Sequence, residues 1–542
     1  MAATHEVTNQ PPPLVGHDTF RTDRALLEGV NRHGANWATS GLSELGRLAG
    51  SEQAQDWGRL ANAYPPVLRT HDRYGNRIDE VEFHPAWHEL MAVAVREGMH
   101  GAPWRQTRLA NHVRRAAAFY LWAQVEAGHG CPISMTYAAI PALRAEPPLA
   151  AEYEPKLVST SYDPGLRPPM TKSGLLAGMG MTEKQGGSDV RANATSALPQ
   201  PDGSYRLQGH KWFCSAPMCD VFLVLAQAPD GLSCLLVPRM LPDGGRNVFR
   251  IQRLKDKLGN RSNASSEVEF QDTLAWRVGS EGRGVPTIIE MVQVTRLDCV
   301  IGSAACMRAA VAQAVHHATY RRAFGGPLRD KPLMRNVLAD LAVEAEAASA
   351  LMLRLAAAVD GRDDRREAAF GRVATAVGKF WVCKRTPTVV AEALECLGGN
   401  GYVEESGMPR LYREAPLNSI WEGSGNVIAL DLLRAMARQS ESVEAFLAEV
   451  DVAAGADARL DAATKRLHGQ LADTDDIVVR ARRVAELMAL CLQGSLLVRF
   501  APPAVADAFC ASRLDGDWGH TLGTLPPGVD GVAIVDRAAP TI

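Results

Sequence analysis

The sequence predicts a mainly α-helical protein that carries an inserted antiparallel β domain and ends in a further helical domain. Apolar residues recur at helical spacing over much of the chain before about residue 175 and again after Gly284. Between these stretches, short runs are separated by turn signals such as Pro229-Asp230-Gly231, which is typical of antiparallel strands. Because helices and strands are segregated along the chain, the pattern argues against an alternating β-α-β dinucleotide fold.

The length of the chain indicates several domains. Its 542 residues exceed what one compact core supports. Changes of pattern place the domains at 1–175 (helical), 176–280 (antiparallel β), 281–438 (helical bundle) and 439–542 (helical extension). In the first domain, Trp87 to Val95 and Leu109 to Val125 carry apolar residues at helical spacing.

Four short runs predict the β domain. Asp220 to Ala226 and Leu232 to Pro238 are mostly apolar, whereas Tyr205 to Leu207 and Glu267 to Phe270 alternate between apolar and polar residues. Turn sequences that contain proline and glycine lie between them, so we expect several short strands joined by tight turns.

Helical periodicity then continues into the tail. Val285 to Arg322 predicts one or two long helices, and the sequence beyond about residue 500 is rich in glycine and proline with no clear element. The other predicted helices are Pro332 to Val359, Ala368 to Cys396, Val427 to Arg438, Ser442 to Val450, Arg459 to Leu471 and Ile477 to Arg499.

Composition excludes several function classes. The net charge of -3 gives no general indication of a polyanion partner, and the ten cysteines form no Cys-x-x-Cys pair, so we expect no metal site. The N-terminus lacks the pattern of a secretory signal, and the apolar stretch from Cys299 to Val315 is broken by Arg308. We therefore expect a cytoplasmic protein with no membrane segment.

Two segments around the predicted β domain suggest ligand binding. Gly180 to Val190 combines paired glycines with the hydroxyls of Thr182 and Ser188, which suits a pyrophosphate or the polar edge of a ring system. Gly209 to Ser215 is a predicted strand with neighbouring aromatic residues and a hydroxyl. Taken alone, the first segment is about as well explained by a plain glycine turn, and the second is better explained by core packing.

Two later segments are equally ambiguous when each is taken alone. Arg321 to Gly325 offers a guanidinium for phosphate, although a charged helix end capped by glycine explains it as well. Leu397 to Gly401 is a double-glycine turn after a helix, and Glu422 follows a short loop and precedes Gly423. The alternative is a surface loop with an incidental glutamate.

The order of these segments resembles the signature of the acyl-CoA dehydrogenase family, strongly from about 175 to 435. The matching motifs are Thr182-Glu183-x-x-x-Gly187-Ser188-Asp189, Gly209-x-Lys211-x-Phe213-x-Ser215, Arg321-x-x-Phe324-Gly325, Leu397-Gly398-Gly399-Asn400-Gly401 and Ile420-Trp421-Glu422-Gly423-Ser424. The resemblance implies the fold of that family, with a C-terminal helical extension, and non-covalently bound FAD.

The resemblance also implies which residues hold the cofactor. Thr182 would contact the polar edge of the flavin ring, and Arg321 with Phe324 would reach the FAD of a neighbouring subunit, which implies a homo-oligomer, usually a tetramer. The full set of implied FAD contacts is Met181, Thr182, Gly187, Ser188, Phe213, Ser215, Arg321, Phe324, Gly398, Gly399, Gly423, Ser424 and Asn426.

Glu422 matches the catalytic base of the family. Dehydrogenation of an acyl thioester needs a base for the α proton while hydride leaves the β carbon, and a carboxylate in a dry site suits that task. One branch of the family carries the glutamate on an earlier helix, where this chain has Thr295. Glu422 is therefore the better candidate.

The length of the chain, together with segments such as Phe83 to His88 and Arg253 to Ser265, resembles a branch of the family that acts in the bacterial adaptive response to DNA alkylation. That resemblance implies binding of double-stranded DNA, protection against an alkylating agent and weak activity on an isovaleryl-CoA-like acyl-CoA. The alternative is a metabolic short- or branched-chain acyl-CoA dehydrogenase with an extension.

The tail supports DNA binding only in part. From residue 440 onward, nine basic residues face fifteen acidic ones, so phosphate contacts would require the basic side chains to gather on one face. Mixed, solvated helix faces explain the composition at least as well. The candidate DNA contacts are Arg434, Arg438, Arg459, Lys465, Arg466, Arg480, Arg482 and Arg483.

Overall fold

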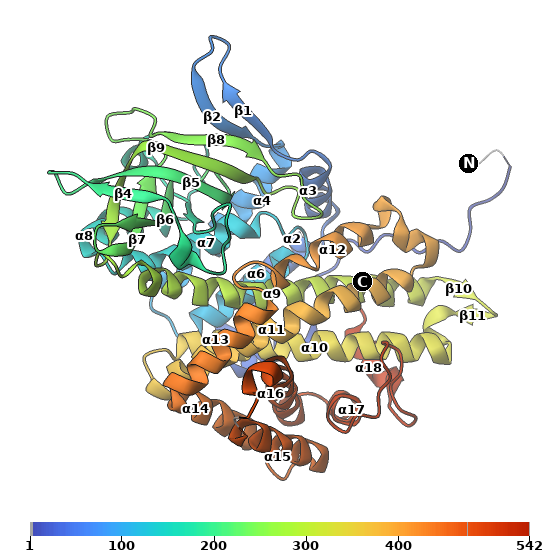
Figure 1. The fold of residues 1–542 in the computed structure, drawn as a ribbon. Coiled ribbons are helices and arrows are strands. Elements are labelled where there is room, and N and C mark those ends of the chain that lie inside the picture. Colours follow the sequence, from blue (N-terminus) through green and yellow to red (C-terminus); the bar gives the residue numbers. More distant parts are fainter. Residues whose placement is uncertain (1–3, 474, 541–542) are drawn as a thin grey trace. The chain divides into compact units, whose positions relative to one another are not determined.

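The computed structural model describes residues 4–473 and 475–540, which fold into helices and one large sheet (Figure 1). The chain forms two compact units. We call Met1–Gln55, Leu109–Val125 and Arg296–Ile542 the helical unit, and Asp56–Arg108 with Glu126–Thr295 the sheet unit. These boundaries differ from the four predicted segments because residues near the N-terminus take part in both units.

The sheet unit is built on seven strands: β3 (Ala177–Gly180), β4 (Ser196–Pro199), β5 (Tyr205–Ser215), β6 (Val221–Ala228), β7 (Gly231–Pro238), β8 (Phe249–Leu254) and β9 (Ser265–Val278). Their order is β3-β6-β4-β5-β9-β7, with β8 on β9, and β6 also pairs with β7. The strands from β6 to β7 therefore form a closed ring. Most pairs are antiparallel, as predicted, but β3 and β4 run parallel to β6.

The sheet unit also contains helices and a hairpin. The helices are α4 (Pro85–Arg96), α5 (Ala102–Arg105), α7 (Gly130–Leu143) and α8 (Pro147–Leu157), while α3 (Glu52–Ala63) crosses the boundary of the unit. The hairpin of β1 (Val67–His71) and β2 (Arg77–Glu82) interrupts the stretch predicted as mostly helical. The hairpin was not predicted because most residues of both strands are exposed or only half-buried, so neither strand shows a clear alternation of apolar and polar residues.

The helical unit begins with α1 (Arg24–Arg32), α2 (Thr39–Ala49) and α6 (Asn111–Ala123). Its central helices are α9 (Gly284–Tyr320, of which Arg296 onward belongs here), α10 (Pro332–Asp360) and α11 (Arg365–Glu395), followed by α12 (Met408–Glu414) and α13 (Gly425–Arg438). The tail forms α14 (Ser440–Val450), α15 (Ala458–Ala472), α16 (Ile477–Phe500), α17 (Pro503–Phe509) and α18 (Gly531–Ala538). Apart from the short α12, which was not predicted, the helices from α9 to α16 match the predicted ranges to within a few residues, because long apolar periodicity encodes them locally.

The core of the helical unit includes paired charges as well as apolar residues. Arg115 on α6 forms a two-point ion pair with Asp298 on α9, and both side chains are buried. Among the described residues, one helix, α9, is long and apolar enough to cross a membrane, but 83% of its most apolar stretch is buried inside the protein. Core helices of globular proteins share this length and composition, and the burial of α9 fits that role.

Candidate active site

The predicted flavin loop follows β3 in the sheet unit and is held by a buried ion pair. The Lys211 ammonium of β5 donates to Glu183 Oε1 at 2.7 Å and to the Leu225 carbonyl oxygen at 2.7 Å. Both charged side chains are fully buried. Burial opposes ionisation of Glu183, but the hydrogen bonds from Lys211 and from the Ala194 backbone outweigh it and lower the pKa of Glu183 to about 2.

The loop that this ion pair holds fits a flavin contact. A Cβ on Gly187 would lie 2.4 Å from Thr182 Oγ1, so a glycine lets the backbone approach the threonine hydroxyl closely. Met181 and Thr182 are half-buried and Ser188 is exposed, so each can reach a ligand. On β5, Phe213 is 53% exposed and Ser215 is half-buried. These hydroxyls, backbone groups and a half-exposed aromatic ring suit the predicted FAD contacts.

In the helical unit, Glu422 lies in a strained loop before α13. Its φ of 57° is in the left-handed region, which a glutamate seldom adopts. Buried Lys379 of α11 donates to the Trp421 carbonyl oxygen at 2.8 Å and also to that of Gly423. Two hydrogen bonds from one lysine therefore hold the backbone on both sides of Glu422 and maintain its strained conformation.

A second cation holds the Glu422 backbone itself. Arg296 Nε donates to the Glu422 carbonyl oxygen at 3.1 Å, and Arg296 Nη1 pairs with Asp431 of α13 at 2.7 Å. Arg372 of α11 pairs with the other oxygen of Asp431 at 3.1 Å. Burial raises the pKa of Asp431, but the two guanidinium groups outweigh burial and lower it. Glu422 thus lies on a preorganised loop, as a catalytic base requires.

The predicted phosphate motif forms a small hairpin beyond α9. The strands β10 (Arg322–Ala323) and β11 (Gly326–Pro327) place Phe324 at the tip, with a φ of 49° and 91% exposure. Arg321 Nη1 donates to the Asn9 carbonyl oxygen at 2.7 Å. A phenyl ring exposed at a strained tip is available for contact with a second molecule.

The remaining cofactor candidates lie just after the end of α11 and at the start of α13. Gly398, with a φ of 60°, and Gly399 lie after α11 with open space where a side chain would begin. Ser424 is the residue before α13, and Asn426 is exposed in its first turn. The side-chain oxygen of Asn426 accepts a hydrogen bond from Arg482 of α16 at 3.0 Å.

The predicted DNA contacts fall into two groups. Arg459 pairs with Asp457 and Asp507, and Arg480 pairs with Asp473. In the part of the chain that the structure describes, six exposed candidates have no ion pair with a carboxylate: Arg434, Arg438, Lys465, Arg466, Arg482 and Arg483. Their charge is therefore not neutralised by a carboxylate, although Arg466 donates a hydrogen bond to the Leu514 carbonyl oxygen and Arg482 donates one to Asn426.

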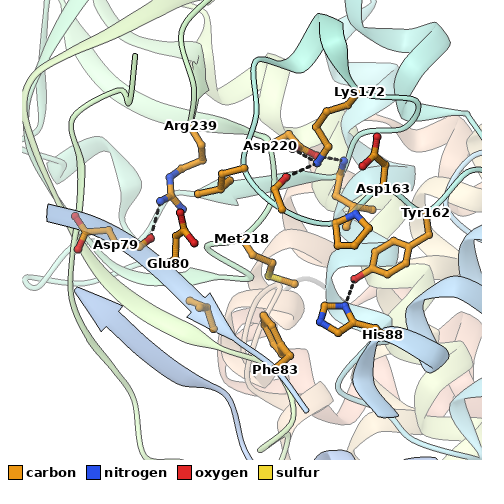
Figure 2. Close-up of a pocket in the computed structure, with 15 residues that line it drawn as sticks. Asp79, Glu80, Phe83, His88, Tyr162, Asp163, Lys172, Met218, Asp220 and Arg239 are labelled. Carbon is orange, nitrogen blue, oxygen red and sulfur yellow. Dashed lines mark hydrogen bonds and ion pairs between the residues drawn. The ribbon is translucent and has the colours of Figure 1, made fainter. Parts of the chain in front are cut away.

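The sheet unit also contains a small cavity that none of the predicted site residues line (Figure 2). Tyr162 and His88 lie on one side, joined by a 2.8 Å hydrogen bond, and the buried Lys172–Asp220 pair lies nearby. Burial raises the pKa of Asp220 to about 6. The cavity volume of about 80 Å³ is far below the roughly 300 Å³ at which ligand pockets begin, so this is not the cofactor site.

The sequence analysis missed the residues that hold the site together. Lys379 is a buried cation in an apolar stretch of its helix, which is the signal that could have identified it. Lys211 is also buried but lies in a strand of mixed polar and apolar residues, and the motif included it without a role. Arg296 and Asp431 carry no comparable signal, because charged residues at helix positions usually face solvent. Among the described residues, no group of three His, Cys, Asp or Glu side chains is placed to hold a metal ion.

Comparisons with known proteins match most of the chain. The adaptive response protein AidB N-terminal domain matches residues 9–164, the acyl-CoA dehydrogenase middle domain 178–273 and the acyl-CoA dehydrogenase C-terminal domain 282–437. The chain is 49% identical over 522 residues to the Escherichia coli (strain K12) protein named "Putative acyl-CoA dehydrogenase AidB", covering 96% of each chain.

Solved structures agree in fold. Caenorhabditis elegans ACDH-11 in complex with C11-CoA superposes with a TM-score of 0.87 at 28% identity, over 95% of this chain and 94% of that chain. An acyl-CoA dehydrogenase from Bacillus anthracis complexed with FAD has a TM-score of 0.64 at 19% identity, over 80% of this chain and 81% of that chain. The second match is of fold alone.

Proposed function

Because the chain belongs to the acyl-CoA dehydrogenase family, we propose that it is an AidB-like flavoprotein that dehydrogenates a short acyl-CoA and also protects DNA against alkylation. It is an FAD-dependent oxidoreductase of the acyl-CoA dehydrogenase type. The physiological substrate and the role in the response to alkylation belong to the proposal.

The site suggests a division of labour in dehydrogenation. The Glu422 carboxylate takes the α proton of the acyl thioester, and Lys379 with Arg296 keeps the backbone of Glu422 in place during the transfer. Bound FAD supplies the acceptor for the hydride that leaves the β carbon. The proposed cofactor contacts are Met181, Thr182 and Ser188 in the sheet unit, and Gly423, Ser424 and Asn426 in the helical unit.

The observation that carries this proposal is the left-handed glutamate held by two buried cations. Strain of this kind costs on the order of 1–3 kcal/mol and persists where function requires it. The test is to mix the purified yellow protein with isovaleryl-CoA without oxygen and to follow the flavin absorbance. Bleaching in the wild type that is absent in Glu422→Gln supports the proposal; equal bleaching in both removes Glu422 from the base role.

The proposed homo-oligomer is supported by exposed apolar side chains on the helical unit. Phe324 is 91% exposed, Leu333 85% and Tyr402 83%. Exposed apolar side chains of this size are candidates for contact with a second subunit. We expect the mass in solution to be that of a tetramer, and Phe324→Ala to weaken both assembly and FAD retention.

Binding of double-stranded DNA in the cytoplasm is the finer part of the proposal. It is supported by the adaptive-response description of the matching N-terminal family and by the six exposed candidate basic residues without carboxylate partners in the described part of the chain. Titration of duplex DNA at low and high salt tests it, because phosphate neutralisation makes affinity fall steeply with salt. A yellow, catalytically active protein that ignores DNA would instead be a metabolic acyl-CoA dehydrogenase with an extension.

A further inference from the structure

The C-terminal extension reaches the first turn of α13, where the catalytic loop ends. Arg482 on α16 lies 56 residues beyond Asn426, and its Nη1 donates to Asn426 Oδ1 at 3.0 Å. Helices α13 and α16 pack against each other, so this hydrogen bond belongs to a helix interface. In Figure 1, α13 (orange) and α16 (red-orange to red-brown) lie next to each other.

The hydrogen bond determines what Asn426 offers to a ligand. Because the amide oxygen accepts from Arg482, the amide nitrogen points the other way, and no acceptor for it lies among the described residues. Asn426 therefore presents two N–H donors outward. An asparagine without Arg482 would be free to turn its amide and present the oxygen instead.

A second cation shares this location. The ammonium of Lys384 on α11 lies 5.6 Å from the centre of the Phe380 ring, and the Arg482 guanidinium lies 5.8 Å from the same ring. Burial lowers the pKa of Lys384, and the neighbouring charges of Arg482 and Lys379 lower it further. Across residues 4–473 and 475–540, neither Lys384 nor Arg482 forms an ion pair with a carboxylate, so the positive potential here is uncompensated.

We propose that Arg482 is a positioning residue of the FAD site, supplied by the C-terminal extension. It acts through Asn426, whose amide it orients as a donor toward the adenosine end of the cofactor, beside the positive charge of Lys384. This inference rests on the proposed contact between Asn426 and that end of FAD. Its consequence is that the extension is part of the flavin site and is not an independent appendage.

Cofactor binding tests this role directly. Apoprotein is titrated with FAD and, separately, with FMN, which lacks the adenosine half, and binding is read from quenching of flavin fluorescence. Arg482→Ala should weaken FAD binding about tenfold, the effect of about 1.4 kcal/mol, and leave FMN binding unchanged. Arg482→Lys keeps the charge without the planar donor and should recover only part of the loss.

A double-mutant cycle separates positioning from simple charge. Asn426→Ala should weaken FAD binding, and adding Arg482→Ala should cost little more, because the arginine acts through the asparagine. Arg483→Ala, at the neighbouring exposed residue, is the matched control and should leave FAD binding as it is. Unchanged thermal unfolding of each variant shows that the fold is retained.

Failure of the Arg482 role and failure of the proposed function give different results. Unchanged FAD affinity in Arg482→Ala, equal losses of FAD and FMN, or fully additive losses in the double variant would overturn the positioning role. Unchanged FAD affinity in Asn426→Ala would remove its premise and overturn it too. A wild-type protein that takes up no FAD at all would sink the proposed function itself.

Discussion

The two predicted parts of the site are both held by a buried lysine, but the two lysines are neutralised differently. In the sheet unit, Lys211 faces the carboxylate of Glu183, so the flavin loop is held by a closed ion pair. In the helical unit, Lys379 donates to the carbonyl oxygens of Trp421 and Gly423, and no carboxylate pairs with it in the described part of the chain.

The different partners of the two lysines suit the different roles proposed for the two loops. A loop that supports a cofactor must keep its shape, and a buried ion pair gives that shape while cancelling its own charge. A loop that presents a base must hold a strained backbone without using the carboxylate of that base as the anchor. Lys379 achieves this by binding the backbone on both sides of Glu422.

The largest expected effect comes from removing Glu422, the proposed base on the second loop. Glu422→Gln should lower kcat for isovaleryl-CoA by about a hundredfold to ten-thousandfold, the usual contribution of a general base. Stability should change little, because the backbone hydrogen bonds from Lys379 and Arg296 remain. Steady-state turnover and thermal unfolding measured on the same sample check both statements; turnover close to that of the wild type would contradict the assignment.

Breaking the ion pair of the first loop should have the next largest effect. Lys211→Met leaves the Glu183 carboxylate buried without its partner and should reduce the free energy of unfolding by about 3–5 kcal/mol. Lys465→Met, at an exposed lysine with no ion pair among the described residues, is the control. Denaturant unfolding checks this, and a loss as small as that of the control would contradict the closed ion pair.

Replacing the lysine that holds the second loop should reduce the free energy of unfolding by less. Lys379→Met removes two hydrogen bonds to carbonyl oxygens but strands no opposite charge, so about 1–3 kcal/mol of stability should be lost. Because the Glu422 backbone loosens, kcat should fall as well. If Lys379→Met costs as much as Lys211→Met, the proposed contrast between the two loops is wrong.

The smallest expected effect is a loss of stability at acidic pH. Because the pKa of Glu183 is lowered to about 2 in the folded protein, its stabilising contribution is fully present above the ordinary carboxyl pKa and is lost as the pH falls from there toward about 2. The wild type should therefore lose more stability than Glu183→Gln between about pH 5 and about pH 3. Parallel unfolding curves for the two proteins across that range would show that Glu183 gains nothing from Lys211.

Local patterns predicted much of the fold. The long helices from α9 to α16 and the strands β6 and β7 lie where periodicity and turn residues placed them, because each is encoded by a continuous run of sequence, whereas the short α12 was not predicted. The β1–β2 hairpin was missed because neither strand has a buried face to produce a clear alternation. The helices α17 and α18 were missed because glycine and proline around them hide short elements.

The candidate site also combines features that the local sequence encodes with features that arise only from folding. The sequence by itself determined the order of the motifs, the family, and the candidates Thr182, Ser188 and Glu422. The residues that hold these candidates in place became visible only in the folded chain. Lys211 binds Glu183, Lys379 and Arg296 bind the backbone around Glu422, and Arg482 binds Asn426. These partners lie tens to more than a hundred residues apart, and a charged side chain looks the same in the sequence whether solvent or a distant partner surrounds it. Burial and pairing are properties of the folded chain, so no local pattern records them.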